Sequence, residues 1–439
     1  MGTTFRDYQP DQRFLLPPSP KDWLPEDHLA YFISDTVEEL DLSGFYAPYR
    51  GDGRRNRPFS PAMMLKILIY CYATGTFSSR KIARRVSEDV AVRVLSANNF
   101  PAHRTIAEFR QRHRQEFKNL FVEVVQIAAE AGLVKLGRLA VDGCKVKANA
   151  SKHKAMSYRR MVEEEKRLEK EIAQLLDRAQ RVDEAEDEQY GVENGGDEIP
   201  KELQRRESRL EKIREAKRRV EERQAEADRE RGRHREDGRK SPRGGRNFKR
   251  DFGVPEDKAQ DNFTDPESRI MKSKGGFEQC YNTQAAVDEQ TQIIVGADVT
   301  NNAADNGQLL GMVDEVEENL GRRPEQVVAD AGYKSEDNFE GLETRKIDGY
   351  IALGREGSEP DQAAKLPATA RMSRKLATDE GRAAYRRRKA IVEPVFGWIK
   401  QVLGFRSFSF RGLDKVQDEW ALVCLALNLK RMNGRIQAC

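Results

Sequence analysis

Apolar positions in the first 134 residues recur every three or four places, which is the period of amphipathic helices. Residues 63–70 are apolar at nearly every position. They follow Ser60-Pro61, a capping serine and a proline suited to the first helical position. We therefore expect a helix there that is buried on most sides. Weaker periodic stretches predict further short helices at residues 28–40, 78–86, 105–113 and 117–131. Together these elements predict a compact helical bundle.

The pattern changes to strand character at residues 136–147. Further apolar runs predict strands at residues 277–288, 291–299, 326–330 and 349–354. Helical periodicity predicts helices at residues 305–320, 335–346 and 379–403. We expect the residues between 354 and 379 to form a disordered basic linker. The order of elements predicts an α/β fold, in which three antiparallel strands and two helix-linked strands form a mixed sheet covered by helices.

A long segment between the first and second predicted strands has a different pattern. Residues 155–186 and 200–232 are strongly charged, and their few apolar residues keep a heptad-like spacing. This spacing predicts an antiparallel helical hairpin with a thin apolar seam and charged outer faces. Residues 231–265 are rich in Gly, Arg and Asp, so we expect them to be poorly ordered.

Charge is distributed unevenly along the chain. Charged residues make up 34% of the sequence and the net charge is only +4, but residues 231–250 carry nine basic and two acidic groups. A basic segment of this density suits nucleic acid or another acidic partner. A solvated, flexible tract would have the same composition, and both interpretations stay open for this segment taken alone.

The five cysteines are scattered and none forms a CxxC pair, which argues against a zinc site and a disulfide framework. A reducing cytoplasm is the natural compartment for such a chain. No apolar run approaches the roughly 18–20 residues of a membrane span, so we expect no membrane partner.

Basic residues gather on the predicted helix at residues 105–113 and beside it. Arg104, Arg110 and Arg114 cluster there with Arg112, and the short helices around them fit a DNA-binding helix-turn-helix with residues 105–110 in its recognition segment. The alternative is a basic, solvated face of an ordinary helical bundle.

Two aspartates each end an apolar run, and a glutamate lies far downstream in a basic, aromatic helix. These residues are Asp142, Asp330 and Glu393. Buried strand ends hold carboxylates rigidly, and three converging carboxylates need cations between them. Such an oxygen-rich site suits Mg²⁺ and phosphoryl chemistry. Each residue could instead have a local role, since the two aspartates could stabilise turns and the glutamate could lie in the first turn of a helix.

Three other aspartates compete for a place in such a site. We interpret them as turn or capping residues: Asp288, Asp298 and Asp305.

The sequence motifs around these carboxylates resemble those of a known protein family. Val-Asp142-Gly, Ala-Asp330-Ala-Gly-Tyr, Val-Glu393-Pro-Val-Phe-Gly-Trp and Tyr281-Asn-Thr-Gln are similar to motifs of the Asp-Asp-Glu (DDE) transposases of bacterial insertion sequences. The resemblance implies a ribonuclease-H-like fold, with the first aspartate on the first strand, the second at the end of the fourth, and the glutamate on a late helix. It covers nearly the whole chain, including the helical N-terminal part.

One branch of that family carries a Tyr-Arg-Glu-Lys signature around the glutamate. Glu393 and Lys400 have the spacing of that signature. Tyr385 and Arg388 keep their mutual spacing but stand one residue too far from the glutamate, and Lys389 occupies the position of the arginine. The resemblance implies that this basic helix contacts DNA phosphates.

The resemblance also implies a mechanism. Two Mg²⁺ ions, for which Mn²⁺ may substitute, would lie about 3.5–4 Å apart, bridged by Asp142 and flanked by Asp330 and Glu393. Lysines at positions 145, 147 and 400 would neutralise nearby phosphates. The expected reaction is phosphoryl transfer that cleaves the ends of the element and then transfers a strand into target DNA. Lys145 and Lys147 follow the first aspartate on its own strand.

Four units are expected from the pattern and the resemblance together. They are a helical DNA-binding domain (1–134), a ribonuclease-H-like catalytic domain (135–150 and 262–405), an inserted helical hairpin with a basic linker (151–261), and a C-terminal helical segment (406–439). The expected partner is double-stranded DNA, both terminal inverted repeats and target, bound by a homodimer in the bacterial cytoplasm at the nucleoid. A ribonuclease-H-like nuclease that only cuts, and a catalytically inactive DNA-binding scaffold, are the alternatives.

Overall fold

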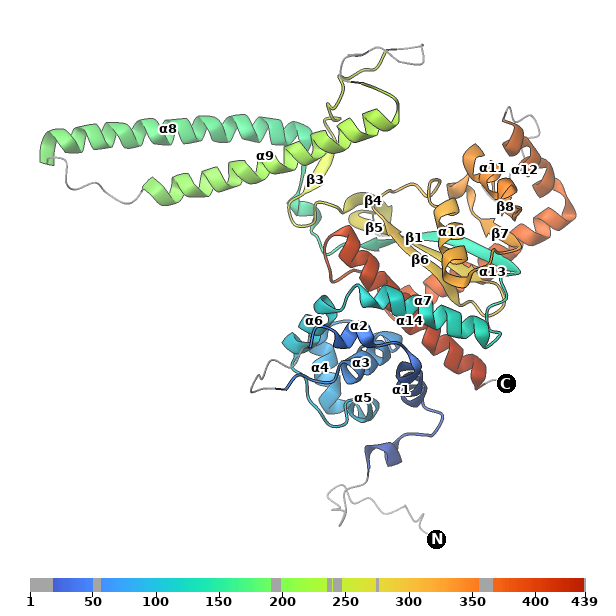
Figure 1. The fold of residues 1–439 in the computed structure, drawn as a ribbon. Coiled ribbons are helices and arrows are strands. Elements are labelled where there is room, and N and C mark those ends of the chain that lie inside the picture. The colour runs from blue at the N-terminus through green and yellow to red at the C-terminus, as the bar shows by residue number, and fades with distance from the viewer. Residues whose placement is uncertain are drawn as a thin grey trace, which may run out of the picture.

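The computed structural model describes residues 19–49, 57–190, 199–234, 239, 247–273, 276–354 and 366–437. It contains a group of short helices from the N-terminal part, a mixed sheet covered by helices, and a long two-helix arm that extends away from both (Figure 1). No helix in this described part of the chain has the length and apolar character to cross a membrane.

The N-terminal helices surround α3 (Pro61–Ala73), which is buried along nearly its whole length. Its sequence is apolar on all sides, and α1, α5 and α14 cover it. The C-terminal helix α14 (Leu413–Ile436) also packs on α7 and on strand β6, so it joins the helical bundle to the sheet. The other elements of the bundle are η1 (Pro20–Trp23), α1 (Leu29–Glu39), α2 (Ser43–Tyr46), α4 (Ser79–Glu88), α5 (Val90–Leu95), α6 (His103–Arg112) and α7 (Glu116–Glu130).

The main sheet has the topology that the order of elements predicted. Strands β1, β5 and β6 are antiparallel neighbours, and β7 and β8 continue the sheet parallel to β1. Their bounds are β1 (Arg138–Lys147), β5 (Gly276–Asp288), β6 (Ile294–Thr300), β7 (Gln326–Ala329) and β8 (Asp348–Ile351). A further strand, β4 (Arg269–Ser273), pairs with the first part of β5 and was not predicted. The fold is therefore α/β and ribonuclease-H-like.

Helices α10 (Leu309–Leu320) and α11 (Glu336–Thr344) connect the later strands, and α13 (Asp379–Gly397) packs against β1, β5, β7 and β8. Pro394 lies inside α13 and has no N–H for the carbonyl of Ala390. The side-chain amide of Gln292 donates to that carbonyl instead, at 2.8 Å. The helix therefore continues past the proline and runs into a π-helical turn, η5 (Trp398–Val402).

The expectation of a disordered linker before α13 was wrong in its second half. Residues 367–377 form helix α12 (Pro367–Ala377), whose first backbone N–H groups, those of Ala368 and Thr369, donate to the carboxylate of Glu336 at 2.5 and 2.9 Å. This long-range cap cannot be recognised from the local sequence. Residues 355–365 lie outside the described residues.

The inserted hairpin is present as α8 (Tyr158–Tyr190) and α9 (Ile199–Glu230). A small apolar cluster joins the two helices near their base and contains Met161, Leu168, Leu210, Ile213, Ala216 and Val220. Ion pairs cross the seam, such as Arg214 to Glu165 at 3.0 Å and Lys217 to Glu165 at 2.9 Å. The hairpin thus has the thin seam and charged surface that its sequence predicted.

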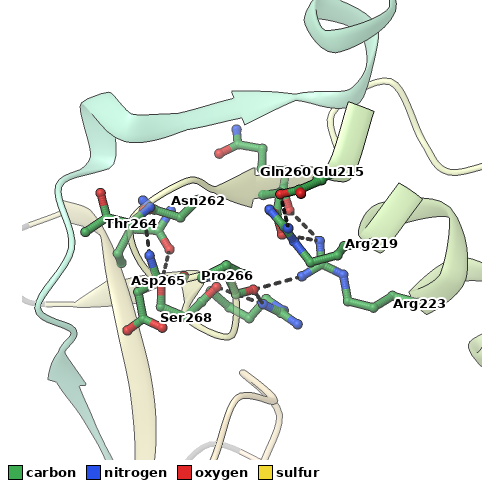
Figure 2. A network of polar contacts seen from close by, with 12 residues as sticks. Glu215, Arg219, Arg223, Gln260, Asn262, Thr264, Asp265, Pro266 and Ser268 are labelled. Carbon is green, nitrogen blue, oxygen red and sulfur yellow. Dashed lines mark hydrogen bonds and ion pairs between the residues drawn. The ribbon is translucent and has the colours of Figure 1, made fainter. Parts of the chain in front are cut away.

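The residues that follow the hairpin were expected to be poorly ordered, and this was wrong for residues 247–265. Strand β3 (Gln260–Asn262) pairs with β2 (Ala155–Ser157) at the base of the arm. Asp261 of β3 is buried and accepts hydrogen bonds from Arg219 at 2.7 Å and Arg223 at 2.9 Å. Figure 2 shows Arg219 and Arg223 beside the segment that contains Gln260. Two guanidinium groups of α9 are therefore held by one carboxylate of the returning chain.

A second buried carboxylate links this region to the sheet. Asp265 accepts a hydrogen bond from the hydroxyl of Tyr281 on β5 at 2.8 Å and one from the backbone N–H of Gly412 at 3.2 Å. Its neighbour Glu267 accepts from the N–H of Leu413, at the start of α14. The base of the arm is thus fixed to the centre of the molecule by side chains that sequence patterns do not pair.

Candidate active site

The register of two parallel strands brings the two predicted aspartates together. Val141 of β1 pairs with Ala329 of β7, so Asp142 and Asp330 occupy the next positions on neighbouring strands. The parallel pairing of β1 with β7 stops just before these two positions, while β1 continues beside β5 to Lys147. Asp142 accepts a hydrogen bond from the N–H of Gly143, and Asp330 accepts one from that of Gly332, both at 2.8 Å. Each aspartate thus uses one oxygen to hold the backbone just after it.

Helix α13 brings an arginine and the predicted glutamate to the same edge. Arg388 Nη1 donates to Asp142 Oδ2 at 3.1 Å, and Arg388 Nη2 lies 3.8 Å from Glu393 Oε1. The Arg388 side chain is only 9% exposed, whereas that of Glu393 is 55% exposed. The guanidinium therefore lies between the first and third predicted carboxylates.

The charges of the site are crowded. Burial raises the pKa of Asp142 to about 6, the Arg388 guanidinium opposes this rise, and the nearby carboxylate of Asp330 adds to it. Acidic groups that crowd each other at a partly buried strand end favour a cation among them, and in this structure the guanidinium provides it.

A third aspartate, Asp305, also lies at this edge. Its carboxylate accepts hydrogen bonds from Lys145 at 3.1 Å, Asn282 at 2.6 Å and Gln284 at 3.0 Å. Asp305 does open a turn, because its carbonyl accepts from the N–H of Gln308 at 3.0 Å, but its carboxylate binds side chains of β1 and β5, which the turn interpretation did not anticipate. Two of these partners, Asn282 and Gln284, could have been expected to share one face of the sheet, because they are two residues apart on a strand within the motif Tyr281-Asn-Thr-Gln.

The other two competing aspartates lie elsewhere. Asp288 accepts from the backbone N–H groups of Leu136 and Gln290, as a turn residue does. Asp298 accepts from the side chain of Gln417 at 2.7 Å.

The predicted lysines and tyrosine lie on β1, η5 and α13. Lys400 donates to the carbonyl oxygen of Lys145 at 2.8 Å, which ties η5 to β1. Lys147 is half-exposed, with its ammonium 3.4 Å from Glu278. The Arg388 guanidinium lies over the Tyr385 ring at 5.9 Å from its centroid. Lys389, which occupies the arginine position of the Tyr-Arg-Glu-Lys signature, is exposed on α13.

The three predicted arginines of the helical bundle are not brought to the carboxylates. Arg104 is exposed on α6. Arg110 is buried and donates to the hydroxyl of Tyr72 at 2.8 Å and to the carbonyl of Phe77 at 3.0 Å. Arg114 forms an ion pair with Asp418 of α14 at 2.5 Å. Of the three, Arg104 is the one whose side chain faces solvent.

The donor set at the strand ends fits a hard divalent cation in its chemistry. Asp142, Asp330 and Glu393 offer carboxylate oxygens, and Asn282 Oδ1 is buried without a hydrogen-bond partner among the described residues. Within the same part of the chain, no three or more His, Cys, Asp or Glu side chains are close enough to enclose a metal ion. The Arg388 guanidinium lies between the first and third carboxylates.

Comparison with protein families identifies the chain. Residues 250–429 match the family described as Transposase DDE domain, and residues 18–112 match the Transposase domain (DUF772) family. The chain belongs to the DDE transposases of insertion sequences. The transposase gave no match among curated proteins or solved structures. Its function is DNA transposition, and its family consists of DNA-binding enzymes that use a divalent metal ion.

The two matched segments contain only part of the candidate site of the transposase. Asp330 and Glu393 lie within residues 250–429, whereas strand β1 with Asp142 lies outside both matched segments. The hairpin of α8 and α9 separates β1 from the rest of its sheet in the sequence. The pairing of β1 with β5 and β7 therefore relates Asp142 to the other two carboxylates of the transposase.

Proposed function

We propose that this transposase binds the ends of an insertion sequence and catalyses metal-dependent DNA cleavage and strand transfer with Asp142, Asp330 and Glu393. The observation that carries the proposal is the parallel pairing of β1 with β7, which sets Asp142 and Asp330 side by side. The contacts of Arg388 with Asp142 and Glu393 support the inclusion of the glutamate.

In this proposal the three carboxylates hold two Mg²⁺ ions, or Mn²⁺ in their place. When bound, the metal would supply Lewis-acid activation and charge stabilisation for phosphoryl transfer. Asp142 and Asp330 are suited to rigid binding because Asp142 lies within β1, where its pairing with β7 stops, and Asp330 directly follows β7. Glu393 is half-exposed on a helix, and the Arg388 guanidinium balances the charge of Glu393 and Asp142 in the metal-free protein.

The cationic side chains near the carboxylates would hold the DNA backbone. Lys145 and Lys400 lie next to each other at the end of β1, and the half-exposed Lys147 follows on the same strand. The exposed Lys389 and its neighbour Tyr385 extend this surface along α13. Contacts of this kind fix the register of DNA and carry no sequence information.

The helical bundle would contact DNA elsewhere, through the exposed Arg104 on α6. We leave Arg110 and Arg114 out of the proposed DNA surface, because the first is buried against Tyr72 and the second is paired with Asp418.

The proposed division of labour follows the four units expected from the sequence. Residues 1–134 bind DNA, residues 135–150 and 262–405 catalyse, and residues 151–261 form the arm. Residues 406–439 support both domains, as the packing of α14 on α3, α7 and β6 suggests. A homodimer is part of the proposal because transposition joins two ends of one element.

The difference from the Tyr-Arg-Glu-Lys spacing corresponds to a specific contact of Arg388 in the structure. Arg388 is one residue too far from Glu393 for that signature, and its guanidinium is directed at Asp142. We propose that the chain belongs to this branch, with Lys389 as the phosphate contact and Arg388 as a partner of the carboxylates.

The test uses purified protein, labelled duplexes from the DNA that flanks the gene, and Mg²⁺ or Mn²⁺. Nicking at the ends of the element is expected from the wild type and not from Glu393→Gln, which should still bind the duplex. Glu380→Gln is the matched control, because Glu380 is an exposed glutamate at the start of the same helix. Unchanged nicking by Glu393→Gln would remove the glutamate from the site.

The alternatives give different products in the same reactions. With a supercoiled target plasmid present, a nuclease that only cuts would nick the ends and form no joined product. An inactive scaffold would bind the ends without cleavage.

A further inference from the structure

We propose that Asp305 is a positioning residue of the catalytic centre, which fixes Lys145, the β1 backbone beside Asp142 and the turn after Asp330 around one carboxylate. The inference rests on the proposed function and deepens it. Asp305 stands in the loop between β6 and α10 and is well separated in sequence from Asp142 and Asp330, yet its carboxylate lies beside Gly143 and Gly332, which follow these two aspartates.

The contacts of Asp305 tie it to the strand that carries Asp142. Lys145 of β1 pairs with Asn282 of β5, and Gly143 pairs with Gln284. The side chains of Lys145, Asn282 and Gln284 all donate to the Asp305 carboxylate. One carboxylate thus gathers three donors from two adjacent strands, directly beyond the first catalytic aspartate.

Two glycines leave the space that Asp305 occupies. A Cβ atom on Gly143 would lie 2.6 Å from Asp305 Oδ1, and one on Gly332 would lie 3.3 Å from Asp305 Oδ2. These glycines follow Asp142 by one residue and Asp330 by two. The carboxylate of Asp305 therefore packs between strand β1 at Gly143 and the turn that follows Asp330.

A buried tyrosine completes the connection to the second aspartate. The hydroxyl of Tyr333 donates to Gln284 Oε1, while Gln284 Nε2 donates to Asp305. Tyr333 is fully buried and ends the short helical turn that Asp330 caps. A chain of side chains therefore runs from the β7 turn through Gln284 and Asp305 to Lys145.

The position of this carboxylate is electrostatically unfavourable on its own. Asp305 lies close enough to Asp142 to raise the pKa of that carboxyl, and a further negative charge opposes the ionisation of its neighbours. Two amide groups and an ammonium offset this repulsion. The Asp305 carboxylate in turn holds the side chains of Lys145, Asn282 and Gln284 where a phosphate and metal ions would bind. Residues that hold metal-binding or substrate-binding groups in place typically contribute about 10–100-fold to metal affinity or activity.

The test compares wild type, Asp305→Asn and Asp298→Asn in three measurements. These are the kcat and KM for nicking of end duplexes, the binding of Mn²⁺ by electron paramagnetic resonance without DNA, and the thermal midpoint. Asp298→Asn is the matched control, because Asp298 is a partly buried aspartate of β6 whose partner is Gln417. Asparagine keeps the size of the side chain and removes its charge.

We expect Asp305→Asn to keep its thermal midpoint and KM, to lose about 10–100-fold in kcat, and to bind Mn²⁺ about 10-fold more weakly. Asp298→Asn should match the wild type in all three. Wild-type kcat and Mn²⁺ binding in Asp305→Asn would overturn the proposal, as would a lower thermal midpoint with unchanged kcat per folded molecule.

Lys145→Gln provides a second line of evidence if Asp305→Asn folds poorly. Because the two residues act through one ion pair, the double variant should be little worse than Lys145→Gln alone in kcat. Additive losses would contradict the coupling. Failure of the wild type to nick would count against the proposed function, whereas the Mn²⁺ measurement would still test the role of Asp305.

Discussion

Arg388 of α13 donates a hydrogen bond to Asp142 of β1 across 3.1 Å, and the two side chains are separated by 246 positions in the sequence. Asp142 is 18% exposed and Arg388 is 9% exposed, so little water screens the pair. The arginine also approaches Glu393, at 3.8 Å. The guanidinium therefore balances charge at the strand ends while it fastens the late helix to the first strand.

Replacement of Arg388 by methionine should destabilise the metal-free protein by about 2 kcal/mol, because Asp142 would be left partly buried without its cation. Urea unfolding measures this loss, and Mg²⁺ should recover part of it. Arg387→Met is the control, because Arg387 is exposed and its ion pair with Glu289 is a surface one. Equal losses in both variants would mean that the contact with Asp142 is unimportant for stability.

Asp261→Asn should loosen the arm, because the guanidinium groups of Arg219 and Arg223 would lose their shared, buried counter-charge. A loss of about 3 kcal/mol is expected at the base of α9. Hydrogen exchange should show faster amide exchange in β3 and in α9 around residue 219. Glu215→Gln is the control, since Glu215 is exposed and 3.9 Å from Arg219. Unchanged exchange in β3 would refute this role of Asp261.

Glu315 of α10 should make stability depend on pH. Burial raises its pKa to about 7, against an ordinary value of 4.5. The folded protein therefore binds this proton more tightly than the unfolded chain. The stability that this group contributes is fully present below about pH 4.5 and is lost as the pH rises through 7, by about 3 kcal/mol in total.

Glu315→Gln should accordingly be more stable than the wild type at pH 8 and equal to it near pH 4.5. Chemical denaturation at the two pH values measures the difference. The exposed Glu318 of the same helix provides the control, Glu318→Gln. An equal gain at both pH values would mean that the gain does not come from the titration of Glu315.

Two arginines of α6 should respond oppositely to substitution. Arg104→Gln is expected to weaken DNA binding and to lower its dependence on salt concentration, by a slope change of about 1, with no change in thermal midpoint. Arg110→Gln should lower the thermal midpoint, because it removes the donor to Tyr72 and Phe77 in the interior. Loss of DNA binding without loss of stability in Arg110→Gln would contradict this division.

Local patterns determined the elements that carry the chemistry. The all-apolar stretch became the central helix α3, the heptad-like spacing became the hairpin of α8 and α9, and the apolar runs that end at Asp142 and Asp330 became β1 and β7. These inferences succeeded because the spacing of apolar residues determines the type of each local element. The order of those elements along the chain then indicates the topology of the sheet. The motifs around Asp142, Asp330 and Glu393 likewise sufficed for the family.

Tertiary structure alone decided which charged groups meet. Arg388 reaches Asp142, Asp305 enters the site, and Arg110 is withdrawn into the interior. Helix α12 is capped by Glu336, and residues 247–265 are ordered by buried carboxylates that bind α9 and β5. The sequence does not show whether a carboxylate or a guanidinium faces water or pairs with a residue that is distant in the chain. Its role is set by burial and by partners that only the folded chain brings within hydrogen-bond distance.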